Sequence, residues 1–232
     1  MSSELSPAPR LNEILARLGP VRQEKVFVQD RTYLIKRPVE ADKLLDLPAV
    51  HAAFNRDEYM PYWADLWPAA RMLAKHLVRQ TFPVGLEALE VGCGLGLAGI
   101  VGLSLGMRVT FTDYDPCALK FAADNARLNG FNDFSTREID WRSPPEDFRF
   151  PLVLGSDLIY EKRLVDPLAT FLKSAIAPDG VAIVVDQDRI PATLFRETLE
   201  AKGLQFATQM VKAGEPGGSR VKGTLYRITH AA

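Results

Sequence analysis

The chain has 232 residues, of which 47% are hydrophobic and 25% charged, and this suits one globular α/β domain with an elaboration. Its formal net charge of −1 gives no overall electrostatic reason to bind nucleic acid or an anionic membrane, so we expect neither partner. The sequence holds two cysteines and shows no secretory signal, no apolar run of about 18 residues and no metal-ligand spacing. We therefore expect a cytoplasmic protein without a disulfide framework, a metal site or a membrane span.

The first sixty residues are predicted to hold a short helix, a β-hairpin and a second short helix. Apolar residues at helical spacing place the first helix over Leu11–Leu18. Alternation over Glu24–Lys36, interrupted by a polar turn, predicts the hairpin. The second helix is expected over Val39–Leu47 and is expected to stop at Pro48.

A longer amphipathic helix is predicted within Met60–Phe82. One buried face is formed by residues at helical spacing, namely Leu66, Ala70, Leu73 and Leu77. Asp65 is expected to cap its start, and Pro68 is compatible with the first turn.

Three aromatic residues come just before this helix. Tyr62 and Trp63 fit a place in the core as well as a place in a site. Trp67 stands at the predicted start of the helix, where an indole can line the entrance of a pocket, and we interpret it as a site residue.

The segment Leu86–Ile100 combines an apolar strand ending in Glu90, three alternating glycines and an Ala/Leu/Gly-rich run. We read it as a buried strand, a tight turn and the start of a helix, with glycine needed for positive φ and for close approach of a ligand. The dinucleotide pattern GxGxxG would require glycine at Leu97. The acid followed by Gly92-Cys93-Gly94-Leu95-Gly96 instead resembles the glycine-rich motif of S-adenosylmethionine (SAM) methyltransferases, with a nucleotide-binding turn as the alternative.

An acid follows the next predicted strand, Arg108–Thr112. Asp113 lies 21 positions after Gly92, the place where doubly wound folds put a carboxylate that accepts hydrogen bonds from ribose hydroxyls. Asp115 is better explained as the cap of a helix that has Pro116 at its first position.

Acid and aromatic residues also follow two later strands. Asp140-Trp141 comes after Ser135–Ile139 and suits an adenine pocket, although a loop aspartate beside a buried tryptophan fits equally well. Asp157 and Tyr160 come after the apolar strand Phe150–Leu154, three positions apart at the edge where α/β sheets bind ligands. We predict that they converge in one cleft; a capping aspartate and a core tyrosine are the alternative.

The chain as a whole is predicted to form an α/β, Rossmann-like seven-stranded sheet flanked by helices, with the last strand antiparallel. Residues 1–60 are expected to be an N-terminal extension, made of a helix and a β-hairpin, packed on a domain over residues 61–232. The remaining expected elements are a helix over Leu164–Ile176, a strand over Val181–Val185, a helix over Ala192–Lys202 and an antiparallel pair over Phe206–Val211 and Val221–Ile228.

These motifs together resemble the seven-strand methyltransferases of lysine methyltransferase family 16, which include bacterial enzymes that methylate the β-subunit of electron transfer flavoprotein. The resemblance rests on Tyr62–Pro68, the turn Glu90–Gly96, Asp113, Asp140-Trp141 and Asp157-x-x-Tyr160. It implies that SAM contacts Trp67, Gly92, Cys93, Gly94, Gly96, Asp113, Trp141 and Ser156, and we predict Glu90 and Asp140 as further cofactor-binding residues. It further implies that Asp157 and Tyr160 face the methyl acceptor.

The implied function is transfer of a methyl group from SAM to a lysine of a protein substrate, by a protein expected to be a monomer. A free lysine amine has a pKa near 10.4, and an apolar cleft lowers it by desolvation. Asp157 is then expected to hold the amine by hydrogen bonding, with no dedicated histidine base. Two alternatives stay open: methylation of a small-molecule amine, and a non-catalytic SAM-binding interaction module.

Overall fold

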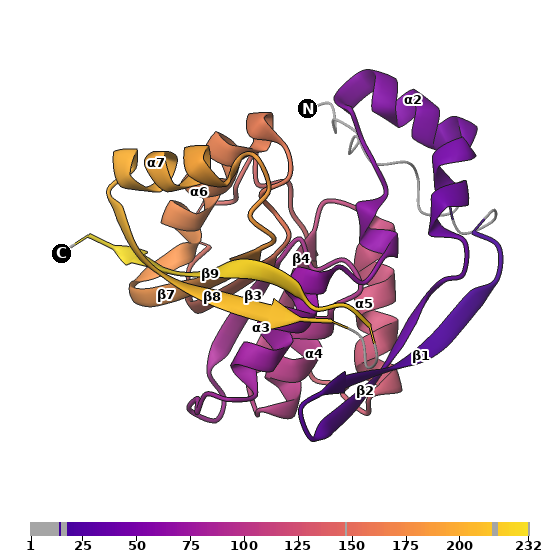
Figure 1. The fold of residues 1–232 in the computed structure, drawn as a ribbon, viewed down its shortest axis with the longest axis horizontal. Helices are drawn as coiled ribbons and strands as arrows, with labels where there is room; N and C mark the ends of the chain where they lie inside the picture. Colours follow the sequence, from indigo (N-terminus) through magenta and orange to yellow (C-terminus); the bar gives the residue numbers. More distant parts are fainter. Residues whose placement is uncertain (1–13, 15–17, 147, 215–217, 232) are drawn as a thin grey trace.

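The computed structural model describes residue 14 and residues 18–146, 148–214 and 218–231, and its centre is one twisted seven-stranded sheet (Figure 1). The strand order is β5-β4-β3-β6-β7-β9-β8. The strands are β3 (Glu87–Val91), β4 (Arg108–Asp113), β5 (Ser135–Glu138), β6 (Phe150–Ser156), β7 (Ile176–Asp186), β8 (Leu204–Ala213) and β9 (Val221–His230).

The sheet is parallel except at β9, which runs antiparallel to both of its neighbours, β7 and β8. The predicted seven-stranded sheet with an antiparallel last strand is thus confirmed. The chain moves outward from β3 to β4 and β5, and then returns to β6 on the other side of β3. Ligands bind at such a reversal of strand order, at the carboxyl ends of the strands.

Helices cover both faces of the sheet. One face is covered by α3 (Pro68–Leu77), α4 (Leu97–Ser104) and α5 (Pro116–Leu128), and the other by α6 (Val165–Ala175), which follows the short 3-10 helix η3 (Lys162–Leu164), and by α7 (Ala192–Ala201). Because side chains alternate along a strand, successive residues such as Ala88 and Leu89 enter the two different cores.

A separate hairpin, β1 (Val21–Val28) with β2 (Arg31–Pro38), confirms the predicted one and packs against α5. Two side-chain amides fix it there. Asn129 Oδ1 accepts from the backbone N–H of Leu34 at 2.9 Å, and Asn125 Oδ1 accepts from that of Lys36 at 2.7 Å. The hairpin is therefore held on α5, the helix that follows β4.

The region after the hairpin differs from the prediction. A 3-10 helix, η1 (Ala41–Asp46), stands where an ordinary helix was expected, and Pro48 begins α2 (Pro48–Asp57) rather than stopping a helix. Proline at the first helical position costs no hydrogen bond and has a suitable φ. The helix predicted over Leu11–Leu18 lies outside the described residues, apart from Ile14 and Leu18.

The prediction that Asp65 caps the following helix is wrong. The chain first forms a 3-10 helix, η2 (Tyr62–Ala64), and then extends, so α3 begins at Pro68 with Trp67 as its N-cap. Asp65 instead pairs with Arg37 Nη1 of the hairpin at 2.9 Å.

Over the described ranges, no helix has both the length and the apolar character needed to cross a membrane.

Candidate active site

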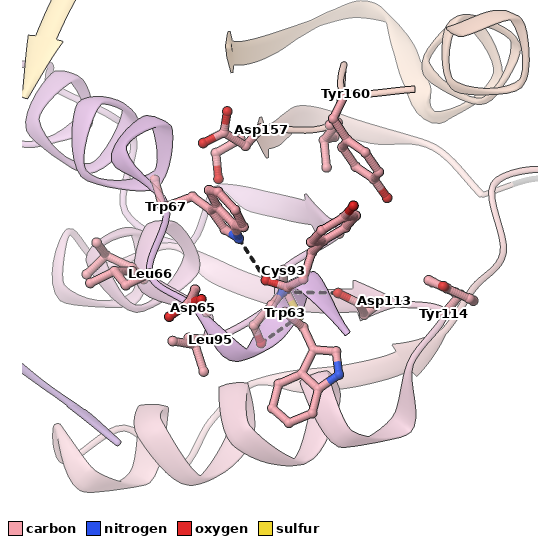
Figure 2. Close-up of a pocket in the computed structure, with 18 of the residues that line it drawn as sticks. Trp63, Asp65, Leu66, Trp67, Cys93, Leu95, Asp113, Tyr114, Asp157 and Tyr160 are labelled. Carbon is pink, nitrogen blue, oxygen red and sulfur yellow. Dashed lines mark hydrogen bonds between the residues drawn. The ribbon is translucent and has the colours of Figure 1, made fainter. Parts of the chain in front are cut away.

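A cleft opens at the carboxyl ends of β3, β4 and β6, beneath the start of α3 (Figure 2). This is the point where the strand order reverses. The cleft brings together residues predicted for both donor and acceptor: Trp67, Gly92, Cys93, Gly94, Gly96, Asp113, Trp141, Ser156, Asp157 and Tyr160. Glu90 and Asp140, which were also predicted to bind the cofactor, do not line it.

The glycine turn forms the floor of the cleft. Gly92, Gly94 and Gly96 have φ of 57°, 50° and 81°, a left-handed backbone that side chains other than glycine rarely adopt. A Cβ on Gly92 would lie 2.6 Å from Leu158 Cδ2. The turn therefore needs glycine both for its conformation and for its space.

Glu90 lies behind this floor. Its Oε2 accepts a hydrogen bond from the backbone N–H of Gly99 at 2.8 Å, which fastens the first turn of α4 to β3. Burial raises the pKa of Glu90 to about 8. Glu90 therefore supports the glycine turn from behind by holding the start of α4.

Asp113 stands at the tip of β4 and holds the turn from the side. Its Oδ2 accepts from the N–H of Gly94 at 3.0 Å, and its Oδ1 accepts from the N–H of Asp115 at 3.1 Å. Burial, with the Asp115 carboxylate nearby, raises the pKa of Asp113 to about 7. A carboxylate has further lone pairs, so Asp113 can also accept from ligand hydroxyls.

Asp115 caps α5, as predicted, because its Oδ1 accepts from the N–H of Cys117 at 2.7 Å. Its other oxygen accepts a hydrogen bond from the hydroxyl of Tyr59. Trp63 Nε1 donates to that same hydroxyl at 3.3 Å, and its indole packs on Phe121, 5.3 Å between ring centroids. Trp63 borders the cleft, but Figure 2 shows its indole turned away from the centre of the cleft, and the side chain is buried in the core.

Asp140 and Trp141 separate in the structure. Trp141 lines the cleft over the glycine turn. Asp140 instead binds the guanidinium of Arg142, with Nη2 to Oδ2 at 2.7 Å, and Arg142 also binds Asp57 at 2.5 Å. The aspartate is therefore occupied beside the cleft rather than in it.

Aromatic rings gather at the mouth of the cleft. Tyr62 lies edge-on to Trp67, 6.0 Å between centroids, and edge-on to Tyr160, 5.3 Å away. Trp67 is the N-cap residue of α3, and its Nε1 donates to the carbonyl of Tyr62 at 2.7 Å, which fixes the indole beside the start of the helix. Burial raises the pKa of the Tyr160 phenol, so Tyr160 is a neutral ring at physiological pH.

Asp157 lies in the wall of the cleft with a φ of 53°, a left-handed conformation that concentrates at functional sites. Its Oδ2 accepts from the N–H of Ala69 at 3.2 Å, at the start of α3. Gln187 Nε2 donates to both oxygens, at 2.9 and 2.8 Å. Burial raises the pKa of Asp157, and the Gln187 hydrogen bond and the Arg189 charge lower it again.

Gln187 and Arg189 are the residues that sequence reasoning missed. Arg189 Nε lies 3.7 Å from Asp157 Oδ1, and its guanidinium stacks over the Trp67 ring at 5.3 Å. The available signal was the polar run Asp186–Arg189, directly after the apolar strand β7 and at the same edge of the sheet.

The residues of the cleft fit SAM. The glycine floor leaves the backbone bare, Asp113 offers acceptors for two ribose hydroxyls, and Trp141 offers a flat apolar face. The rings of Tyr62, Trp67 and Tyr160 suit a positively charged sulfur by cation–π attraction. No group of three or more metal-ligating side chains occurs among the residues that the structure describes.

The family comparison agrees with this site. Residues 55–202 match the model of the lysine methyltransferase family. The chain belongs to that family. The match takes in the aromatic segment, the glycine turn, Asp113, and Asp157 with Tyr160.

Relatives of this lysine methyltransferase family member include a protein N-lysine methyltransferase of Xenopus tropicalis, 36% identical over 116 residues, or 47% of this chain and 54% of that protein. The electron transfer flavoprotein beta subunit lysine methyltransferase of Mus musculus is 28% identical, over 54% of this chain and 49% of its own. The protein-lysine N-methyltransferase rrg1 of Schizosaccharomyces pombe is 28% identical, over 70% of this chain and 58% of its own. The chain spans about half the length of the curated relatives it matches.

Solved structures share the fold. A TehB-like SAM-dependent methyltransferase from Corynebacterium glutamicum has a TM-score of 0.56 at 18% identity, covering 84% of this chain and 100% of its own. A ribosomal protein L11 methylase from Lactobacillus delbrueckii has a TM-score of 0.56 at 22% identity, covering 71% and 79%. The Rossmann-like methyltransferase architecture is therefore established.

Proposed function

We propose that this protein transfers a methyl group from SAM to the side-chain nitrogen of a lysine in a protein substrate. The observation that carries the proposal is that one cleft is lined both by Asp113 with the glycine turn and by Asp157 with Tyr160. Membership of the lysine methyltransferase family, and relatives named for lysine methylation, support lysine as the acceptor.

The donor half of the cleft binds and orients the cofactor. Asp113 would accept hydrogen bonds from the ribose, the turn Gly92–Gly96 would admit the ligand against the backbone, and Trp141 would cover the adenine. When bound, SAM supplies an electrophilic methyl group on a positively charged sulfur. Holding donor and acceptor in line is the main catalytic task, because the displacement itself needs little further help.

The acceptor half prepares the amine. Trp67, Tyr62 and Tyr160 exclude water from the mouth, and this desolvation favours the neutral amine with its lone pair. Asp157, held by Gln187, accepts a hydrogen bond from the amine and fixes its direction. The proton that nitrogen loses passes to water.

A transfer assay with tritium-labelled SAM and a cell lysate tests the proposal. Label in a protein band, stable to base, is the expected result. Label in the small-molecule fraction would instead identify a small-amine methyltransferase, and base-labile label would identify carboxyl methylation. Calorimetric SAM binding without any transfer would identify a non-catalytic SAM-binding module.

We further propose that the protein acts in the cytoplasm as a monomer, with residues 1–60 as an extension of the catalytic domain. The two cysteines, Cys93 and Cys117, are buried free thiols, which suits a reducing compartment. Size-exclusion chromatography with light scattering tests the oligomeric state, and a mass of two chains would contradict it.

A further inference from the structure

A second concave surface lies beside the active site and has a different character. We name it the basic groove, and its floor is α3, between the turn of the β1–β2 hairpin and the loop ends of β8 and β9 (Figure 1). The described residues that line it include the cations Arg71, Lys75, Arg79 and Arg220, and one exposed aromatic residue, Phe27.

Positive charge in this groove is concentrated by the helix. Arg71, Lys75 and Arg79 recur every four residues, so they lie along one side of α3 and the turn after it. None of the described residues that line the groove is acidic. The formal net charge of the whole chain is only −1, so this cluster is a local feature and not a general one.

Two of these cations, Lys75 and Arg79, have neutral partners. Lys75 Nζ donates to the carbonyl of Lys212 at 3.5 Å. Arg79 Nη2 lies 2.9 Å from the side-chain oxygen of Gln29, in the amide orientation that satisfies both groups. Burial, together with the charges of Arg79 and Arg220, lowers the pKa of Lys75. The cations therefore repel one another, and an anion between them would relieve that repulsion.

Arg71 connects the groove to the hairpin. It lies 3.6 Å from Glu24, and Glu24 is shared with Arg22 and Arg37. Asp65 also pairs with Arg37, so two carboxylates face three guanidiniums, and the net charge of this group of side chains is positive.

The groove and the active-site cleft both border α3. Ala70 lines the cleft and the next residue, Arg71, lines the groove. Lys75 lies about 6 Å further along α3, a distance that two residues of extended peptide span. A polypeptide whose lysine enters beside Trp67 can therefore reach the basic groove with residues close to that lysine.

We propose that the basic groove docks an acidic segment of the protein substrate, with Lys75, Arg79 and Arg220 binding its carboxylates and Phe27 contacting an apolar side chain. This inference rests on the proposed function, since it takes the substrate to be a protein. Charge complementarity favours an acidic partner. The low net charge of the chain, and an aromatic contact limited to one residue, favour a peptide over a nucleic acid strand, which would stack on successive rings.

The test uses the full chain and fluorescence polarisation with two labelled probes. One probe is a peptide of glutamates interrupted by leucines, and the other is oligothymidylate. The groove variant is Lys75→Glu/Arg79→Glu. The matched control is Arg149→Glu/Lys173→Glu, which makes the same charge change at two exposed positions outside the groove. Arg220→Glu, at an exposed position beyond the helix, serves as a second groove variant if the first fails to fold.

The wild type is expected to bind the acidic peptide at about 0.05 M salt and to lose most of that binding at about 0.3 M, since exposed charges are screened. The groove variant should bind it about tenfold more weakly, while the control stays within about twofold. Calorimetric SAM affinity should be equal in all three proteins, because the substituted residues lie outside the cleft.

Three outcomes would overturn the inference. The first is that the wild type does not bind the acidic peptide. The second is that the groove variant and the control lose peptide affinity equally. The third is that the wild type binds oligothymidylate more tightly than the peptide and that the groove variant loses this affinity. The peptide assay contains neither SAM nor methyl transfer. Docking can therefore fail while the tritium assay succeeds, and the reverse, so the two failures are distinguishable.

Discussion

The two ends of the cleft each hold a buried aspartate at the tip of a strand, but the two aspartates are held differently. Asp113 is fixed by the backbone N–H of Gly94, in the glycine turn 19 residues earlier, and by that of Asp115, in its own loop. Asp157 is fixed by the side chain of Gln187 and by the start of α3 at Ala69, which is 88 residues earlier. The contacts of Asp113 thus come from backbone N–H groups at most 19 residues away, whereas those of Asp157 come from a side-chain amide 30 residues away and a backbone N–H 88 residues away.

This difference assigns different tasks to the two ends. A carboxylate held by backbone keeps a fixed place and suits the part of the ligand that never changes. Asp157 is held partly by a side-chain amide, so the residue at position 187 can tune it, and this suits the end that selects and orients the acceptor. Variants at each end should therefore separate cofactor binding from turnover.

The largest effect is expected at the acceptor end. Asp157→Asn keeps the shape and tolerates the left-handed backbone, but it removes the charge that orients the amine. Turnover should fall about 100-fold or more, a loss typical of a misplaced reacting group. Calorimetric SAM affinity should stay within about twofold of the wild type. Asp179→Asn, at an exposed aspartate, is the control; normal turnover in Asp157→Asn would refute the role of this carboxylate.

The matching change at the donor end should give the opposite pattern. Asp113→Ala removes charge-assisted hydrogen bonds to the ribose and should weaken SAM binding by about 1–3 kcal/mol. Titration calorimetry measures this, with Asp124→Ala on the exposed side of α5 as the control. Wild-type affinity in Asp113→Ala would show that the ribose lies elsewhere.

A smaller effect is expected from the residue that positions Asp157. Gln187→Leu removes the donor to both carboxylate oxygens, and turnover should fall about tenfold with SAM affinity unchanged. Since the Gln187 hydrogen bond lowers the pKa of Asp157, its loss raises that pKa. The acidic limb of the pH–rate profile should therefore move to higher pH. Gln205→Leu, on exposed β8, should move neither quantity, and an unshifted limb in Gln187→Leu would leave Gln187 with only a packing role.

The smallest effect concerns stability beneath the donor end. Glu90 has a folded-state pKa of about 8, above its ordinary value near 4.3, so the folded protein retains a proton that the unfolded chain releases between these pH values. Stability from this group is complete below about pH 4.3 and is lost as pH rises through about 8. Glu90→Gln keeps an oxygen for the Gly99 N–H and removes the titration.

Thermal unfolding of both proteins from pH 5 to pH 8 measures this effect. The melting temperature of the wild type should fall relative to Glu90→Gln as the pH rises, by about 2–4 °C for each kcal/mol. If the difference in melting temperature between the two proteins stayed constant across this pH range, Glu90 would be ionised in the folded protein.

The same contrast explains which parts of the molecule could be predicted. The donor end could be predicted because a glycine turn and an acid about 20 residues later form one sequence motif, and the contact between Gly94 and Asp113 lies within it. The acceptor end could be predicted only as residue types, since the Asp157 contacts with Ala69 and Gln187 join segments that no local pattern connects. Arg189 could not be predicted for the same reason, since its contact with Asp157 also joins separate segments.

The fold shows the same limits at the element boundaries. The strands could be predicted because each is a short apolar or alternating run, and the antiparallel β8–β9 pair because a Gly/Pro-rich loop separates two such runs. Pro48 was misjudged because a proline that begins a helix and one that stops it look alike in sequence. Asp65 was misjudged because its partner, Arg37, belongs to the hairpin.

The most direct test of the central claim is mass spectrometry of lysate proteins after reaction with SAM that carries a deuterated methyl group. With the wild-type protein we expect the heavy methyl on the side-chain nitrogen of a lysine, and with Asp157→Asn we expect its near-complete loss. A heavy methyl on another side chain, on small molecules alone, or undiminished labelling by Asp157→Asn would contradict it.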